Sequence, residues 1–186
     1  VLVLDDWIDG TGTTPDEVLE KLLANDSGSG GMGGMDHGEM DGMNHGAMDE
    51  AAPWGDAGDV TYPLFLINGK PPTDPDVLAA KPGQKVRLRV INAASDTIFT
   101  VALGGHRLTI THSDGHAVEP TEVGAFYIGM GERYDAIVTL ADGAFPLVAR
   151  PFGKTSGGQA MAVVRTGAGA APPVAADPSE LAGQVL

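Results

Sequence analysis

The sequence predicts an all-β fold, a β-sandwich with one short helix near its start. Glycine and proline contribute 27 and 13 of the 186 residues, and aromatic residues only 5%. This composition is typical of a turn-rich domain and argues against a helical bundle. Seven or eight short apolar runs also follow one another at about 8–12-residue spacing, each bounded by turn residues. The length suits one domain of ordinary size or two very small ones.

The elements before residue 60 are one strand and one helix. Residues 1–8 (VLVLDDWI) read as a strand that ends in an acidic turn. Thr14 is expected to cap the helix, with Pro15 at its first position and Glu17 completing a capping box. The helix should end near Ala24 and carry one apolar stripe. That stripe consists of Val18, Leu19, Leu22 and Leu23.

The elements after residue 60 are strands. The expected strands are residues 62–67, 84–92, 97–103, 106–112, 123–128, 133–140 and 145–150. In the second of them Leu88 and Val90 alternate with Arg87 and Arg89, which indicates a half-buried antiparallel strand. The turn signals between strands are Asn68-Gly69, Gly104-Gly105, Asp114-Gly115, Gly129-Met130-Gly131 and Asp142-Gly143. We therefore expect one domain over residues 1–166, followed by an Ala/Pro-rich linker, 167–186, toward a following domain.

The formal charge of −14 is concentrated near the start of the chain. Residues 1–69 contain fourteen acidic residues and one basic residue, Lys21, whereas residues 70–186 are nearly neutral. The acidity argues against a nucleic-acid partner. The absence of cysteine excludes disulfides, thiolate metal sites and cysteine nucleophiles. No apolar run has the length of a membrane helix.

Residues 25–58 form an insertion of unusual composition. They contain ten glycines and no Ile, Leu, Val, Phe, Lys or Arg, so we expect this segment to be flexible or only conditionally ordered. A tandem repeat lies inside it. Residues 35–41 (MDHGEMD) and 43–49 (MNHGAMD) match at five of seven positions with a period of eight.

The repeat places soft metal ligands in register. The candidate copper ligands are Met32, Met35, His37, Met40, Met43, His45 and Met48. Thioether sulfur favours Cu(I), and imidazole accepts either oxidation state of copper. The surrounding acids would raise the local concentration of a cation. The sequence therefore favours a weak or transient copper site, and the alternative is an inert acidic loop.

The remaining histidines do not form an evident metal site. His106 and His112 would share one face if residues 106–112 form a continuous strand, and His112 could share a metal with His116. No third ligand is evident, so we favour hydrogen-bonded histidines at strand ends and a surface histidine. Ser113 and Asp114 lie near these histidines, but the chain has no G-x-S-x-G motif, which argues against a hydrolase.

Several short motifs, taken in order, carry a resemblance to a known family. They are Val3-Leu4-Asp5-Asp6-Trp7, Leu66-Ile67-Asn68-Gly69-Lys70-Pro71-Pro72, Arg87-Leu88-Arg89-Val90-Ile91-Asn92-Ala93, Gly105-His106-Arg107-Leu108-Thr109-Ile110 with Asp114-Gly115, and Gly131-Glu132-Arg133-Tyr134-Asp135. Over roughly residues 1–24 and 60–166 the chain resembles the middle cupredoxin domain of three-domain multicopper oxidases of the laccase-like and copper-resistance type.

The resemblance implies a Greek-key, cupredoxin-like β-sandwich, and it implies that this domain holds no catalytic copper. In such enzymes the type 1 copper needs Cys and His ligands in the last domain, and the trinuclear cluster uses H-x-H pairs of the outer domains. This chain has neither, so no type 1, 2 or 3 copper ligand carries over. Residues 131–135 would form a turn feeding a core strand, and His106 would be structural.

The resemblance also implies partners and a location. The domain would pack the flanking cupredoxin domains of one periplasmic or secreted parent chain together. That parent would oxidise Cu(I) or phenolic substrates and reduce oxygen. Some bacterial members carry a Met-rich insertion in the last domain, whereas here it precedes the main body of the middle domain. The alternatives are a free-standing periplasmic copper carrier and a structural β-sandwich with an inert acidic loop.

Overall fold

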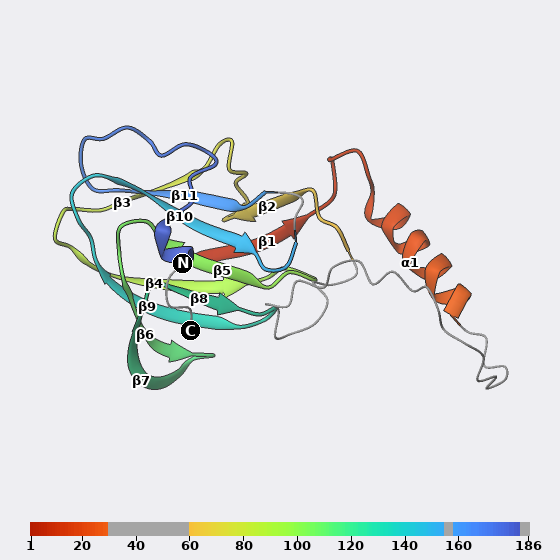
Figure 1. The fold of residues 1–186 in the computed structure, drawn as a ribbon, viewed down its shortest axis with the longest axis horizontal. Coiled ribbons are helices and arrows are strands. Elements are labelled where there is room, and N and C mark those ends of the chain that lie inside the picture. The colour runs from red at the N-terminus through yellow and green to blue at the C-terminus, as the bar shows by residue number, and fades with distance from the viewer. Residues whose placement is uncertain (30–59, 155–157, 183–186) are drawn as a thin grey trace, which may run out of the picture.

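The computed structural model describes residues 1–29, 60–154 and 158–182, and within them the chain forms two β-sheets that pack face to face (Figure 1). The first sheet has the spatial order β2 (Leu64–Ile67), β1 (Leu2–Trp7), β4 (Lys85–Asn92), β9 (Arg133–Thr139), β6 (Leu108–Ser113) and β7 (His116–Val123). The second has the order β3 (Asp76–Ala79), β11 (Ala160–Arg165), β10 (Ala144–Pro151), β5 (Phe99–Leu103) and β8 (Ala125–Ile128). The predicted β-sandwich is therefore confirmed.

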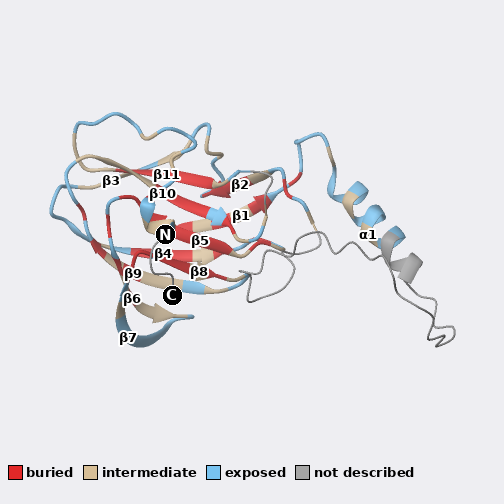
Figure 2. Ribbon diagram, in the orientation of Figure 1, coloured by how far each residue is buried: buried red, intermediate tan, exposed pale blue. Residues whose placement is uncertain are grey.

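The core fills the space between the sheets, where the buried residues of facing strands meet (Figure 2). Phe65 and Phe99 come from different sheets and meet edge to face, with ring centroids 5.7 Å apart. Phe126 is also completely buried. Aromatic residues are few in this chain, and burying three of them fully makes them large contributors to its stability.

The alternation in β4 has the predicted effect on burial. Leu88 and Val90 are buried, and Arg87 and Arg89 are exposed. The strand pairs antiparallel with β9, as expected, but it pairs parallel with β1, where Leu2 lies opposite Val90. A parallel pair needs a long connection, and here the chain between β1 and β4 supplies it.

Three strands lie outside the predicted runs. Two of them, β3 and β7, lie at sheet edges and are mostly exposed or half-buried, so they lack an apolar signal. Pro120 within β7 further weakens the pattern, although an edge strand tolerates proline. The third, β11, is buried on both faces and is built largely from alanine and valine, so it shows no alternation.

Two predicted turns have the backbone that their residues favour. Asn68 and Gly69 have φ of 53° and 73°, and Asp114 and Gly115 have φ of 49° and 84°. Two successive residues in the left-handed region define the tight hairpin turn that Asn-Gly and Asp-Gly favour. The second turn joins β6 directly to β7.

The helix α1 (Pro15–Ser29) begins as predicted but ends later. The Glu17 carboxylate accepts the Thr14 N–H at 2.9 Å, and the Thr14 hydroxyl accepts the Glu17 N–H at 3.3 Å, which confirms the capping box. The expected end near Ala24 is wrong, because the helix continues through residues 25–29 (NDSGS), although these residue types have low helix propensity. Neither this helix nor any other described one is long and apolar enough to cross a membrane.

The apolar stripe predicted for α1 is only partly used. Val18 packs against the core, but Leu19 and Leu23 are 54% and 61% exposed. Within the described chain, the apolar stripe of this helix is therefore buried only in part. The helix lies at one end of the sandwich (Figure 1).

The Ala/Pro-rich tail lies against the outer face of the second sheet. Ala176 and Leu181 pack against a small apolar cluster of Val148, Met161 and Val163. The Glu180 carboxylate, in the 3-10 helix η1 (Ser179–Ala182), accepts the Gly105 N–H at 2.8 Å. A following domain remains a prediction.

Candidate functional site

The candidate copper ligands fall outside the described residues. Met32, Met35, His37, Met40, Met43, His45 and Met48 all belong to residues 30–59. The structure describes the two places where the body borders this segment, α1 before it and Val60 after it. The helix lies at one end of the sandwich (Figure 1), and Val60 lies beside it, since Val18, Lys21 and Val60 line the same recess.

Val60 is held by an ion pair between Lys154 and Asp96. The Val60 N–H donates to the Asp96 carboxylate at 3.0 Å, and the Val60 carbonyl accepts from the Lys154 ammonium at 2.8 Å. The two charged groups are 3.0 Å apart, and their side chains are 7% and 25% exposed. Both backbone polar groups of Val60 are therefore satisfied by one partly buried ion pair, which we call the Val60 clamp.

An aromatic ring completes the surroundings of Lys154. Its ammonium lies 5.2 Å from the centroid of the Tyr62 ring, a distance that allows a cation–π interaction. Burial raises the pKa of the Tyr62 phenol, and the negative charge of Asp6 raises it further. The ring therefore stays neutral well into the alkaline range. A carboxylate, a carbonyl and an aromatic face together compensate the desolvation of the ammonium.

The loop that carries Asp96 is organised by a buried carboxylate, Asp6. Its side chain accepts the N–H groups of Ser95 and Asp96 at 2.9 and 3.0 Å and the Thr97 hydroxyl at 2.8 Å. Asp6 is only 5% exposed, so these bonds satisfy a charge that burial would otherwise penalise. The contacts run from β1 through this loop to the Val60 clamp.

Sequence reasoning missed these residues, although one signal for Asp6 was present. Leu2, Leu4 and Asp6 occupy alternate positions of β1, and all three are buried. An acid at an inward position of a strand indicates a buried hydrogen-bond acceptor. The neighbouring Asp5 lies on the other face, and burial, together with the charge of Asp6, raises its pKa despite a backbone hydrogen bond.

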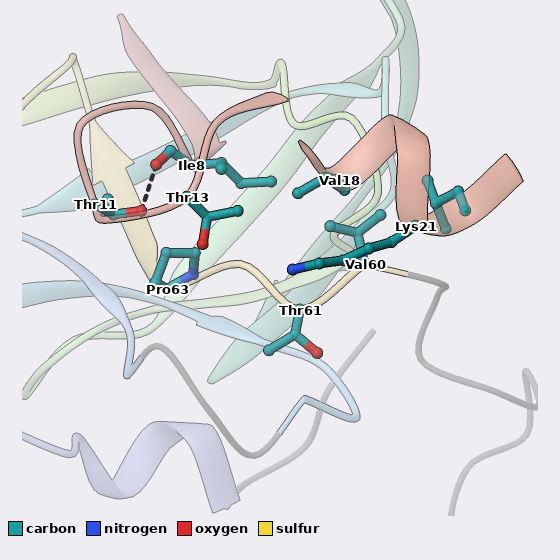
Figure 3. A pocket seen from close by; sticks show the side chains of 9 residues that line it. Ile8, Thr11, Thr13, Val18, Lys21, Val60, Thr61 and Pro63 are labelled. Atoms are coloured by element: carbon teal, nitrogen blue, oxygen red, sulfur yellow. Dashed lines mark hydrogen bonds between the residues drawn. The ribbon is translucent and has the colours of Figure 1, made fainter. Parts of the chain in front are cut away.

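A recess of about 370 Å³ lies between α1 and the adjacent body. Its walls come from α1, from the loop that follows β1 and from the segment that precedes β2 (Figure 3). Ile8, Val18 and Val60 supply apolar surface, and Lys21 supplies an ammonium. We call this cavity the α1 recess.

His106 is a structural histidine, as expected. Its Nε2 accepts the Ala141 N–H at 3.0 Å, so Nδ1 carries the proton and donates to the Gly104 carbonyl at 2.8 Å. The ring is buried and meets the edge of Phe145. Strand β6 begins at Leu108, so His106 lies before it.

His112 and His116 lie at the hairpin between β6 and β7. The condition for His106 and His112 to share a strand face is not met, because β6 begins only at Leu108 and has a bulge between Ile110 and His112. His112 then lies opposite Asp135, and its Nδ1 is 3.1 Å from the Thr111 hydroxyl. His116 is exposed. In the described part of the chain no three histidine, aspartate or glutamate side chains are grouped to hold a metal.

The donor set does not fit the catalytic copper sites of an oxidase. The full sequence has no cysteine, and no two of its five histidines are separated by a single residue. The residues that turn into β9 are structural too, since Gly131 has φ of 79° and Arg133 begins the strand. The chain therefore contains a folded body without the ligands for type 1 or trinuclear copper.

Comparison with known proteins identifies the relatives of this chain. A family model described as multicopper oxidase matches residues 1–169. The multicopper oxidase MmcO of Mycobacterium tuberculosis is 45% identical over 182 residues, which cover 97% of this chain and 34% of that protein. Copper resistance protein A of Escherichia coli is 33% identical over 118 residues, covering 63% of this chain and 19% of that protein. The chain thus spans about a third or less of these relatives.

Solved structures show the same fold. The multicopper oxidase Fet3p, which functions in iron import, matches with a TM-score of 0.66 at 14% identity, over 92% of this chain and 28% of that one. A laccase from Botrytis aclada matches with a TM-score of 0.59 at 21% identity, over 88% of this chain and 28% of that one. The fold is therefore cupredoxin-like, and this chain belongs to the multicopper oxidase family.

Proposed function

We propose that this chain is the non-catalytic middle domain of a three-domain multicopper oxidase and that its Met/His-rich insertion recruits copper. The proposal rests on one observation, that the chain belongs to the multicopper oxidase family but lacks the residues that bind catalytic copper. The family model covers residues 1–169, yet the chain has no cysteine and no H-x-H pair. A family member that spans about a third of its relatives and lacks these ligands would leave the catalytic copper to other domains.

The proposed parent activity is the oxidation of Cu(I) or phenolic substrates coupled to the reduction of oxygen to water. A relative named copper resistance protein A and one named laccase support these two substrate classes. Both the copper-related name and the acidic, thioether-rich insertion favour a periplasmic or secreted parent. The domain would pack the flanking cupredoxin domains together.

The chemistry of the insertion supports copper capture. Five methionines and two histidines occur within seventeen residues, and no lysine or arginine lies among them. Thioether and imidazole ligands together suit Cu(I). The Val60 clamp holds the chain where this segment rejoins the body, so captured copper would stay tethered to one end of the sandwich.

A Cu(I) competition titration of the 186-residue chain against a chromophoric chelator tests copper capture. We compare the native chain with a variant in which the five insertion methionines become leucine and His37 and His45 become alanine. The matched control changes Met130→Leu and His116→Ala, which are exposed outside the insertion. Cu(I) binding should disappear in the first variant and persist in the control. Equal binding by all three proteins would contradict copper capture.

Two further measurements separate the alternatives. Copper-loaded chain should show no intense blue absorption and no oxidase turnover, because it lacks a copper thiolate. A blue and active sample would overturn the non-catalytic role. The encoding reading frame distinguishes a domain from a copper carrier, since an oxidase gene must encode H-x-H pairs and a cysteine elsewhere. An inert loop predicts that copper leaves the melting temperature unchanged, whereas specific binding raises it.

A further inference from the structure

We propose that the α1 recess binds a small aromatic monocarboxylate. The argument for this binding does not depend on copper capture, since it rests only on described residues of the recess wall. The recess combines two features that such a ligand requires. Its apolar walls are already formed, and it presents one ammonium without an ion pair among the described residues.

The apolar walls are held by contacts that do not involve a ligand. The Ile8 carbonyl accepts the Thr11 N–H at 3.1 Å, which closes the loop after β1. The capping box at Thr14 sets the start of α1 and so the direction of Val18. The Val60 clamp holds the third wall, which is the segment that precedes β2. A ligand therefore finds ordered apolar surface and does not have to order the chain itself.

Except for the Thr11 hydroxyl, which donates to the Ile8 carbonyl, the polar side chains of the recess lack partners within the described part of the chain. Lys21 makes no ion pair there, and it is the only basic residue among residues 1–69. Figure 3 shows its side chain reaching from α1 across the recess toward the Val60–Thr61 segment, with Thr13 on the opposite wall. The Thr13 and Thr61 hydroxyls make no hydrogen bond to another described residue.

This combination selects one class of ligand. A carboxylate pairs with the ammonium, while a flat apolar ring covers Ile8, Val18 and Val60. A phosphate dianion suits the recess less well, because one ammonium cannot compensate two charges beside apolar walls. The fourteen acidic residues of the N-terminal segment also disfavour a second negative charge.

The experiment is a titration of the ¹⁵N-labelled 186-residue chain with three probes, followed through the amide signals of Lys21 and Thr61. Benzoate carries both the charge and the ring, acetate carries only the charge, and benzamide carries only the ring. At physiological ionic strength the Debye length is about 8 Å, which screens the more distant acids. Benzoate should bind at least about fivefold more tightly than either of the other two probes.

Two lysine variants test the ammonium. Lys21→Met should weaken benzoate binding about tenfold, which corresponds to the loss of one charge-assisted contact. Lys81→Met removes the same charge from an exposed site outside the recess, and it should leave the affinity unchanged. Both lysines are exposed, so neither variant should unfold.

The outcomes divide clearly. Equal affinity for benzoate and acetate would mean that the walls are not used, and equal affinity for benzoate and benzamide would mean that the charge is not used. Either result overturns the proposal, as does equal benzoate binding by the Lys21→Met and Lys81→Met variants or no binding at all. Because copper is absent from every arm, a negative result leaves the proposed copper capture untouched.

Discussion

The Val60 clamp predicts that Lys154→Met destabilises the chain far more than the loss of an ordinary lysine. The substitution keeps most of the apolar stem and removes the ammonium. It deprives the Val60 carbonyl of a donor at 2.8 Å and the Asp96 carboxylate of a counter-charge at 3.0 Å. The lysine side chain is only 7% exposed, so water cannot replace it without rearrangement.

The magnitude follows from this burial. Removing one partner of a fully buried ion pair costs about 3–5 kcal/mol. Asp96 is 25% exposed and keeps the Val60 N–H as a donor, which reduces the loss. We therefore expect a decrease of about 2–3 kcal/mol in the free energy of unfolding. For a chain of this size the melting temperature should fall by roughly 5–10 °C.

The assay is urea unfolding followed by far-UV circular dichroism. Lys70→Met is the matched control, because Lys70 pairs with Asp74 at 2.9 Å but the two side chains are 49% and 76% exposed. It should change stability by less than about 0.5 kcal/mol. A double-mutant cycle of Lys154→Met with Asp96→Asn should give a coupling energy of at least about 1 kcal/mol. Hydrogen exchange at the Val60 amide should also accelerate in the Lys154 variant.

Two results would refute this reasoning. Equal stabilities of the Lys154→Met and Lys70→Met variants would show that the ion pair beside Val60 behaves as a solvated surface pair. A coupling energy near zero would show that the cost of Lys154→Met does not arise from Asp96.

Three further predictions concern titration and the structural histidine. Burial raises the pKa of Asp5 above the ordinary 3.8, so Asp5 loses its proton more readily in the unfolded chain and lowers the stability of the fold at neutral pH. Asp5→Asn should therefore raise the melting temperature slightly at about pH 7 and lose that gain by about pH 3. Burial likewise raises the pKa values of Tyr62 and Tyr134 above 10.0, so their phenolate absorbance should appear at a higher pH than that of free tyrosine. The stability of the fold should decline as the pH rises above about 10. His106→Leu leaves the Ala141 N–H and the Gly104 carbonyl without their partner. In urea unfolding it should lower the free energy of unfolding by about 2–3 kcal/mol without altering Cu(I) affinity. His116→Leu, at an exposed position, should change neither the stability nor the Cu(I) affinity.

The local parts of the fold were predictable because their signals lie close together in the sequence. The capping box needs only Thr14 and Glu17, and the hairpin turns need only Asn-Gly or Asp-Gly. The alternation of β4 depends on its own residues and a nearby core. By contrast, β11 is buried on both faces because β3 and β10 flank it, and no pattern within its six residues reveals those neighbours.

The candidate site likewise has features that the sequence predicts and contacts that only the fold creates. The methionine and histidine repeat is a property of the sequence, and its ligand chemistry can be judged without coordinates. The Val60 clamp joins residues 58 and 94 positions apart, and Asp6 bonds a loop 89 to 91 positions away. Such contacts depend on how two sheets stack, so charge counting alone assigns Lys154 and Asp96 to a solvated surface.

The sequence by itself determined the fold class, the family resemblance, the missing catalytic copper ligands and the clustering of soft ligands, because each depends on residue identity and short-range order. The tertiary structure decided which acids and lysines are buried together, where the α1 recess forms and how the tail lies on the second sheet. Burial is the physical reason. A carboxylate or ammonium that the fold leaves exposed is a solvated charge, whereas one that the fold buries beside a partner becomes a structural ion pair.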